Sequence, residues 1–134
     1  MSTDRTRESR LVVAVPHARL RDALARALDL PGAICVVGQA HDLAGAVDVT
    51  RRAGADGIVL GAGILREDVV GNLRDVVAAL PGVHIVVVGS ETGAAYANAM
   101  KTAGAADYIA LEQGTDALAR AARRAIAAAP VEAA

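Results

Sequence analysis

Short runs of apolar, mostly β-branched residues recur along the chain at nearly regular intervals. The runs are LVVAV (11–15), AICVVG (33–38), GIVL (57–60), HIVVV (84–88) and DYIA (107–110). Each run is almost continuously apolar, as is typical of strands that are covered on both faces. The pattern therefore predicts a series of short, buried strands.

A different periodicity fills the stretches between these runs. Apolar residues recur at helical spacing within 20–28, 43–50, 69–80, 96–103 and 118–126. Asp42 stands where an N-cap of the second helix is expected. Strands that alternate with helices predict a parallel sheet with helices on both faces. The expected fold is a three-layer (βα)5 structure of the α/β class, in which the loops after the strands carry the function.

The predicted elements account for one domain in a chain of 134 residues. We place this domain at residues 11–129. Residues 1–10 are predicted to form a disordered N-terminal tail, and residues 130–134 a C-terminal tail.

Composition and charge exclude several classes of partner. Aromatic residues make up 1% of the chain, with two Tyr and no Phe or Trp, so stacking platforms for single-stranded nucleic acid are missing. A formal net charge of −1 provides no basic field for a phosphate backbone. The apolar runs are too short to span a membrane, and the polar N-terminus lacks the apolar core of a signal peptide. We expect a cytoplasmic protein that contacts neither nucleic acid nor membrane directly.

Few residues are available for metal binding or nucleophilic catalysis. The single cysteine, Cys35, lies within the second apolar run and is interpreted as a buried apolar thiol. His17 and His41 follow the first and second strands and are interpreted as solvated loop residues rather than metal ligands. The sequence therefore predicts no metal centre.

Three longer stretches carry a resemblance to a known family. They are LVVAVPHARLRDALARAL, VVGQAHDLAGAVDVTRRAGADGIVL and AMKTAGAADYIAL. They resemble the receiver (CheY-like) domain of response regulators, which takes part in phosphorelays of two-component signal transduction. The resemblance covers roughly residues 10–128 and implies a flavodoxin-like sheet with the strand order 2-1-3-4-5.

The residues that carry out phosphoryl transfer in that family have no counterpart here. Val15 and Pro16 stand in place of the acidic pair that binds Mg²⁺, and Gly61 replaces the phosphoaccepting aspartate. Gly89 replaces the serine or threonine, and Leu111 replaces the lysine. Mg²⁺ needs oxygen ligands, and phosphoryl transfer depends on charge neutralisation. The resemblance therefore implies a receiver scaffold without phosphorylation, catalysis or a cofactor.

One signalling position of the family is retained. Tyr108 matches the aromatic switch residue on the fifth strand. In receivers, the fourth helix, fifth strand and fifth helix form the usual docking and dimer face. The resemblance implies that this face contains Tyr96, Met100, Tyr108, Leu111 and Leu118. Our first hypothesis is a pseudo-receiver that acts through a homodimer or another protein partner.

An alternative function rests on VVVGSETGAAYA (86–97). Its glycines and hydroxyls resemble the phosphate loop of flavodoxins, although that loop follows the first strand and this one follows the fourth. The backbone at a helix N-terminus can bind an anion, which makes Gly89, Ser90, Thr92 and Gly93 a candidate anion-binding loop. The second hypothesis is therefore a sensor of a nucleotide or another small anion at the carboxyl edge of the sheet.

Overall fold

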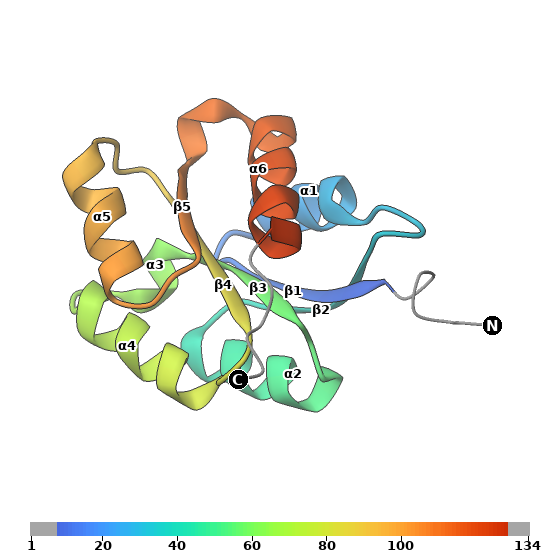
Figure 1. The fold of residues 1–134 in the computed structure, drawn as a ribbon, viewed down its shortest axis with the longest axis horizontal. Coiled ribbons are helices and arrows are strands. Elements are labelled where there is room, and N and C mark those ends of the chain that lie inside the picture. Colours follow the sequence, from blue (N-terminus) through green and yellow to red (C-terminus); the bar gives the residue numbers. More distant parts are fainter. Residues whose placement is uncertain (1–7, 129–134) are drawn as a thin grey trace.

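A five-stranded parallel sheet lies between two layers of helices (Figure 1). The computed structural model describes residues 8–128. The strands are β1 (Ser9–Ala14), β2 (Ile34–Ala40), β3 (Gly57–Gly61), β4 (His84–Gly89) and β5 (Asp107–Ala110). Their order is β2-β1-β3-β4-β5, and every neighbouring pair is parallel. The predicted fold class and strand order are confirmed.

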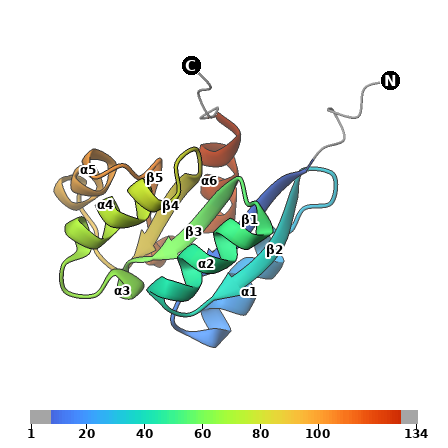
Figure 2. The same ribbon diagram turned by 90° about the horizontal axis from the view of Figure 1, so that it is seen from below.

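The helices divide between the two faces of the sheet. One face is covered by α1 (Ala18–Leu28) and α6 (Thr115–Ala128). The other is covered by α2 (Leu43–Ala53), α4 (Val69–Ala79) and α5 (Ala94–Thr102). Figure 2 shows α2 and α4 in front of the sheet and α1 behind it.

Each face of the sheet has its own hydrophobic core. In β1, Leu11 and Val13 pack with residues of α1 and α6, whereas Val12 and Ala14 pack on the opposite face. All four side chains are fully buried. Burial on both faces explains why the strands appear in the sequence as continuous apolar runs without polar alternation.

Two short elements were not predicted. A single helical turn, α3 (Ala62–Leu65), follows β3 directly, and a 3₁₀ turn, η2 (Leu111–Gln113), follows β5. Both begin at the carboxyl edge of the sheet, so they shape the loops in which function is expected.

The predicted N-terminal tail is wrong at its last residues. β1 already begins at Ser9, and the Arg10 backbone N–H donates a 2.7 Å hydrogen bond to the Asp56 carboxylate. The Arg10 guanidinium also donates to the Ala53 carbonyl at the end of α2. Arg10 is thus held by pairing with β2 and by hydrogen bonds to Asp56 and Ala53, which precede β3. These contacts join residues that are far apart in the sequence, so the polar character of the N-terminus did not reveal them. Residues 1–7 and 129–134, which include the predicted C-terminal tail, lie outside the described residues.

Between residues 8 and 128 there is no helix with the length and hydropathy that a membrane crossing requires.

Candidate functional site

A cavity of about 380 Å³ opens at the carboxyl edge of the sheet. It lies where the loops after β1, β3 and β4 meet the first residue of η2. The five positions that the resemblance assigns to phosphotransfer all line it, namely Val15, Pro16, Gly61, Gly89 and Leu111. We call this space the carboxyl-edge cavity. The structure therefore brings together residues that are far apart in the sequence, as predicted.

The lining of the carboxyl-edge cavity has little polar chemistry. Its polar side chains belong to His17, Ser90, Glu91 and Tyr96, and no lysine or arginine is among the described residues that line it. The Arg21 guanidinium donates a 2.9 Å hydrogen bond to the carbonyl of Val15, but Arg21 itself does not line the cavity, so little positive charge faces a bound anion. This lining is a poor match for an anion.

The backbone around Gly61 is closely packed. A Cβ atom at this position would lie 3.3 Å from Cδ of Pro16 and 3.5 Å from Cα of Val15. Pro16 thus takes up space next to the end of β3, and a larger side chain at position 61 would require it to shift.

Metal-ligating side chains are not clustered in the described part of the chain. Between residues 8 and 128, no three His, Cys, Asp or Glu side chains come close enough to hold a metal ion. His17 lines the carboxyl-edge cavity. His41 instead lies beside the exposed Asp42 carboxylate, with 3.7 Å between Nε2 and Oδ2.

The chain resembles known proteins in its structure but matches none in the sequence comparisons. No protein-family model and no curated protein sequence matches the chain. Among solved structures, a LuxR-family two-component response regulator from Aurantimonas sp. aligns with a TM-score of 0.79 at 21% identity, covering 92% of this chain and 89% of that one. The receiver domain of the response regulator NarL from Mycobacterium tuberculosis aligns with a TM-score of 0.78 at 21% identity, covering 91% and 98%. The response regulator domain of Thermotoga maritima CheB gives 0.75 at 24% identity, covering 92% and 100%.

The chain has the fold of a response-regulator receiver domain. Tyr108, which the resemblance assigns to the switch position, has its side chain pointing inward. Tyr108 is 8% exposed, and its hydroxyl donates a 2.8 Å hydrogen bond to the backbone carbonyl of Glu91 in the loop before α5. Its ring packs edge-to-face on Tyr96, with 5.0 Å between the centroids. The Tyr108 side chain is therefore held by a hydrogen bond and a ring contact.

Gly89 makes this inward position of Tyr108 possible. A Cβ atom at position 89 would lie 2.8 Å from the Tyr108 hydroxyl oxygen and 3.0 Å from Cβ of Ala62. The phenol therefore occupies the space that a side chain at the end of β4 would need. Sequence reasoning missed this coupling. The signal that could have revealed it is the parallel register, in which Val87 pairs with Tyr108 and Gly89 pairs with Ala110.

Both tyrosine hydroxyls are held in the neutral form. Burial raises the pKa of Tyr108 above its usual value, and the neighbouring Tyr96 adds to the increase. Burial also raises the pKa of Tyr96, with a further contribution from the Glu91 carboxylate. The pair therefore acts as packing and hydrogen-bonding groups at neutral pH.

The predicted docking face needs correction. Met100 and Leu118 are 1% and 2% exposed, and Tyr108 is also buried, so these three residues belong to the core. Leu111 is half-buried against the core beneath α1 and α6. The apolar stripe of a helix marks its buried side, which is why sequence reasoning placed core residues on a surface. Of the predicted residues, Tyr96 and Leu111 keep partial access to solvent, and both open into the carboxyl-edge cavity.

The exposed part of the α5–β5–α6 face combines polar and charged side chains with small apolar ones, such as Ala95 and Ala99. On α5 it includes Asn98 and Lys101, and Lys101 Nζ lies 3.8 Å from the Asp107 carboxylate of β5. On α6 it includes Arg120 and Arg124, which are exposed. A partner at this face would meet charges, an amide and alanine side chains rather than large apolar ones.

The residues of the candidate anion-binding loop do not lie together at one cavity. Gly89 is buried in β4, and Ser90 lines the carboxyl-edge cavity. Thr92 and Gly93 are exposed and lie outside the described lining of that cavity. Gly93 has φ 107°, which suits a glycine, and provides no side-chain cap to α5. The loop therefore does not converge on one bound group.

Proposed function

We propose that this chain is a pseudo-receiver, a non-enzymatic signalling module that works by protein contact and without phosphorylation. The observation that carries the proposal is the carboxyl-edge cavity. Its five phosphotransfer positions are occupied by Val15, Pro16, Gly61, Gly89 and Leu111, and none of these side chains has an oxygen or nitrogen atom. The scaffold of a receiver is thus combined with a site that cannot bind Mg²⁺ or accept a phosphoryl group.

The arrangement of Tyr108 supports a constitutive mode of action. Its hydroxyl is tied to the Glu91 carbonyl, and Gly89 offers no side chain to compete for the same space. A protein that responds to a signal needs two states with different affinities for that signal. With neither a phosphoacceptor nor a displaceable group at position 89, we infer that the α5–β5–α6 face has one arrangement.

The partner in this proposal is a second copy of the chain or another protein at the α5–β5–α6 face. Lys101, Asp107, Arg120 and Arg124 give that face both signs of charge. Complementary charges at an interface select the partner and raise the association rate more than the affinity. The proposed contact is therefore specific and sensitive to salt.

The direct test is exposure to phosphoryl donors and their mimics. Acetyl phosphate with Mg²⁺ should leave the mass unchanged, and beryllofluoride with Mg²⁺ should leave the amide spectrum unchanged at residues 15–17, 61 and 89. The Gly61→Asp variant should also stay unmodified, because the metal ligands and the lysine are still missing and these groups act as a unit. Mg²⁺-dependent phosphorylation of either protein, or beryllofluoride shifts at those residues, would contradict the proposal.

A ligand sensor is retained as the second candidate because the carboxyl-edge cavity has about 380 Å³ of space, within the range of small-molecule sites. Its lining carries Glu91 and no described lysine or arginine, which favours a neutral or cationic ligand over the anion that the sequence suggested. A thermal-shift screen distinguishes the two functions, since a ligand at 100 times its Kd adds about 2.7 kcal/mol of stability.

A further inference from the structure

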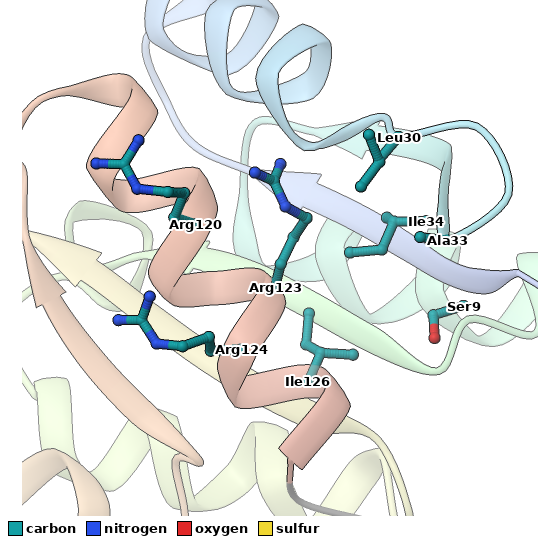
Figure 3. A pocket seen from close by; sticks show the side chains of 8 residues that line it. All are labelled: Ser9, Leu30, Ala33, Ile34, Arg120, Arg123, Arg124 and Ile126. Carbon is teal, nitrogen blue, oxygen red and sulfur yellow. The ribbon is translucent and has the colours of Figure 1, made fainter.

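A second cavity, of about 450 Å³, lies away from the carboxyl-edge cavity, beside α6 (Figure 3). Its lining includes Ser9 and Ile34, the first residues of β1 and β2, so it lies at the amino edge of the sheet. Leu30 and Ala33 come from the turn between α1 and β2, and Ile126 comes from the last turns of α6. We call it the amino-edge cavity.

The apolar side of the amino-edge cavity is held in place by the backbone. Leu30 is 44% exposed and is the large hydrophobic side chain left in solvent among the described residues. Its backbone exchanges two hydrogen bonds with Ile34, of 2.9 and 2.8 Å. The Gly32 N–H within the same turn donates to the Glu8 carboxylate. The exposure of Leu30 therefore belongs to an ordered turn, next to the buried side chains of Ile34 and Ile126.

The α6 side of the amino-edge cavity is formed partly by arginines, of which Arg123 lies nearest to the apolar wall. Arg120, Arg123 and Arg124 of α6 line it, and no acidic residue does among those described. Between residues 8 and 128, none of these arginines has a carboxylate within ion-pair distance. Figure 3 shows Arg123 beside the gap that separates α6 from Leu30 and Ile34, with Arg120 and Arg124 extending from the outer side of α6.

Arg123 is the best placed of the three arginines. One of its terminal nitrogens donates a 2.8 Å hydrogen bond to the Ala27 carbonyl of α1, which orients the guanidinium over the cavity. A guanidinium has five N–H donors, so further donors remain for a second group. A carboxylate is the group that matches this fork, because it can accept two parallel hydrogen bonds.

We propose that the amino-edge cavity binds an amphipathic carboxylate, a small molecule with a medium-length alkyl or aryl body and one anionic head. The body would cover Leu30, Ile34 and Ile126, and the head would meet Arg123. The volume lies within the range of small-molecule sites. A purely ionic ligand would leave the apolar wall in water, and a purely apolar ligand would leave the arginines without a partner.

Three probes distinguish the contribution of the apolar body of the ligand from that of its anionic head. Decanoate has both tail and charge, decanol has the tail alone, and acetate has the charge alone. In an NMR titration of the isotope-labelled chain, decanoate should shift the amides of Leu30, Ala33, Ile34 and the last turns of α6. We expect decanoate to bind at least about tenfold more tightly than decanol, and acetate to cause no localised shift. Equal affinity for decanoate and decanol, or decanoate shifts that do not centre on the cavity, would overturn the proposal.

Variants test the role of the arginine. Arg123→Gln should weaken decanoate about tenfold and leave decanol unchanged, whereas Arg123→Lys should weaken decanoate less, because it keeps the charge but loses the paired donors. An unchanged decanol affinity also shows that the apolar wall has not collapsed. The matched control is Arg52→Gln on α2, which removes an exposed arginine on the opposite face of the sheet. If Arg52→Gln weakens decanoate as much as Arg123→Gln does, the binding reflects net charge and the proposed site is wrong.

Discussion

Gly89 and Tyr108 share one small volume at the carboxyl edge of the sheet. The missing Cβ of Gly89 leaves room for the phenol, whose hydroxyl reaches the Glu91 carbonyl at 2.8 Å. The phenol in turn closes the space beside Ala62. At the residue scale, the loss of a side chain at the end of β4 and the fixed position of the aromatic are therefore one structural feature.

Replacing Gly89 by alanine should displace Tyr108. The added Cβ would lie 2.8 Å from the hydroxyl oxygen, so the phenol must shift, which strains its hydrogen bond to Glu91. We expect a loss of about 1–3 kcal/mol in the free energy of unfolding, measured by chemical denaturation. Gly63→Ala is the matched control, because its Cβ meets only Cγ of Pro16, at 3.4 Å, and it should be neutral or slightly stabilising. Equal stability of the Gly89→Ala and Gly63→Ala proteins would show that Tyr108 is not held by Gly89.

Alkaline titration tests the burial of the two tyrosines, Tyr96 and Tyr108. The chain has two tyrosines and no tryptophan, so near-ultraviolet tyrosinate absorbance comes from Tyr96 and Tyr108 alone. Burial raises the pKa of both, so both should titrate above the usual value of about 10. The folded state then binds these protons more tightly than the unfolded state does. Their contribution to stability is complete below about pH 10 and is lost as the pH rises through the raised pKa values. Titration of both groups at the value of an unfolded chain would exclude the buried arrangement.

The sequence predicted which residues lie at the site, but it did not predict which of their side chains are buried and which are exposed. The strand ends gave Val15, Pro16, Gly61, Gly89 and Leu111, and the structure places all five around one cavity. Which side chains face solvent could not be read in the same way. Met100 and Leu118 show that a helical apolar stripe looks the same whether it is core or docking surface, and only the packing of neighbouring elements decides.

At the scale of elements, long periodic segments were predictable and very short ones were not. The five strands and five longer helices follow from apolar runs and helical spacing. In contrast, α3 has four residues and η2 has three, which is too short for any periodicity to appear. Such turns depend on how the chain leaves a buried strand, and that geometry is set by the folded sheet.

Side-chain caps explain where two of the helices begin. The Asp42 carboxylate accepts a 2.8 Å hydrogen bond from the Gly45 N–H at the start of α2, as the sequence predicted. Asp68 does the same for Gly71 at the start of α4, at 3.1 Å. Both side chains satisfy backbone donors that a helix leaves without intrahelical partners.

Asp42→Ala should therefore lower the free energy of unfolding by about 1 kcal/mol, and Asp68→Ala by a similar amount. Chemical denaturation of the purified variants measures both effects. The matched control is Asp75→Ala, which removes an exposed carboxylate from α4 at a position that is not a cap. That control should change stability by no more than about 0.5 kcal/mol. A cap variant as stable as the control would mean that the hydrogen bond contributes nothing to that helix.

At the scale of the whole molecule, three surfaces of the receiver fold are candidates for binding: the carboxyl edge of the sheet, its amino edge and the α5–β5–α6 face. The carboxyl edge carries one cavity, and the amino edge carries the other, beside α6. The α5–β5–α6 face lies beside β5, the strand at the end of the sheet. Because the large apolar residues under this face are buried, any association must use its exposed charged, polar and alanine side chains.

Charge reversal at Lys101 tests whether the α5–β5–α6 face is the working surface. Lys101→Glu places a second negative charge near Asp107, where the wild-type ion pair is 3.8 Å long. An exposed pair of this kind contributes at most about 1 kcal/mol, so the fold should persist. Like charges at an interface oppose binding, and we expect self-association or capture of a partner to weaken by about tenfold or more. Sedimentation over a range of concentrations measures the first, and affinity capture with quantified partner yield measures the second. Arg26→Glu on α1 makes the same change of charge on an exposed helix away from this face and should have no effect. If Lys101→Glu and Arg26→Glu behave alike, the contact lies elsewhere, and a ligand at the carboxyl-edge cavity becomes the better account of what this receiver fold does.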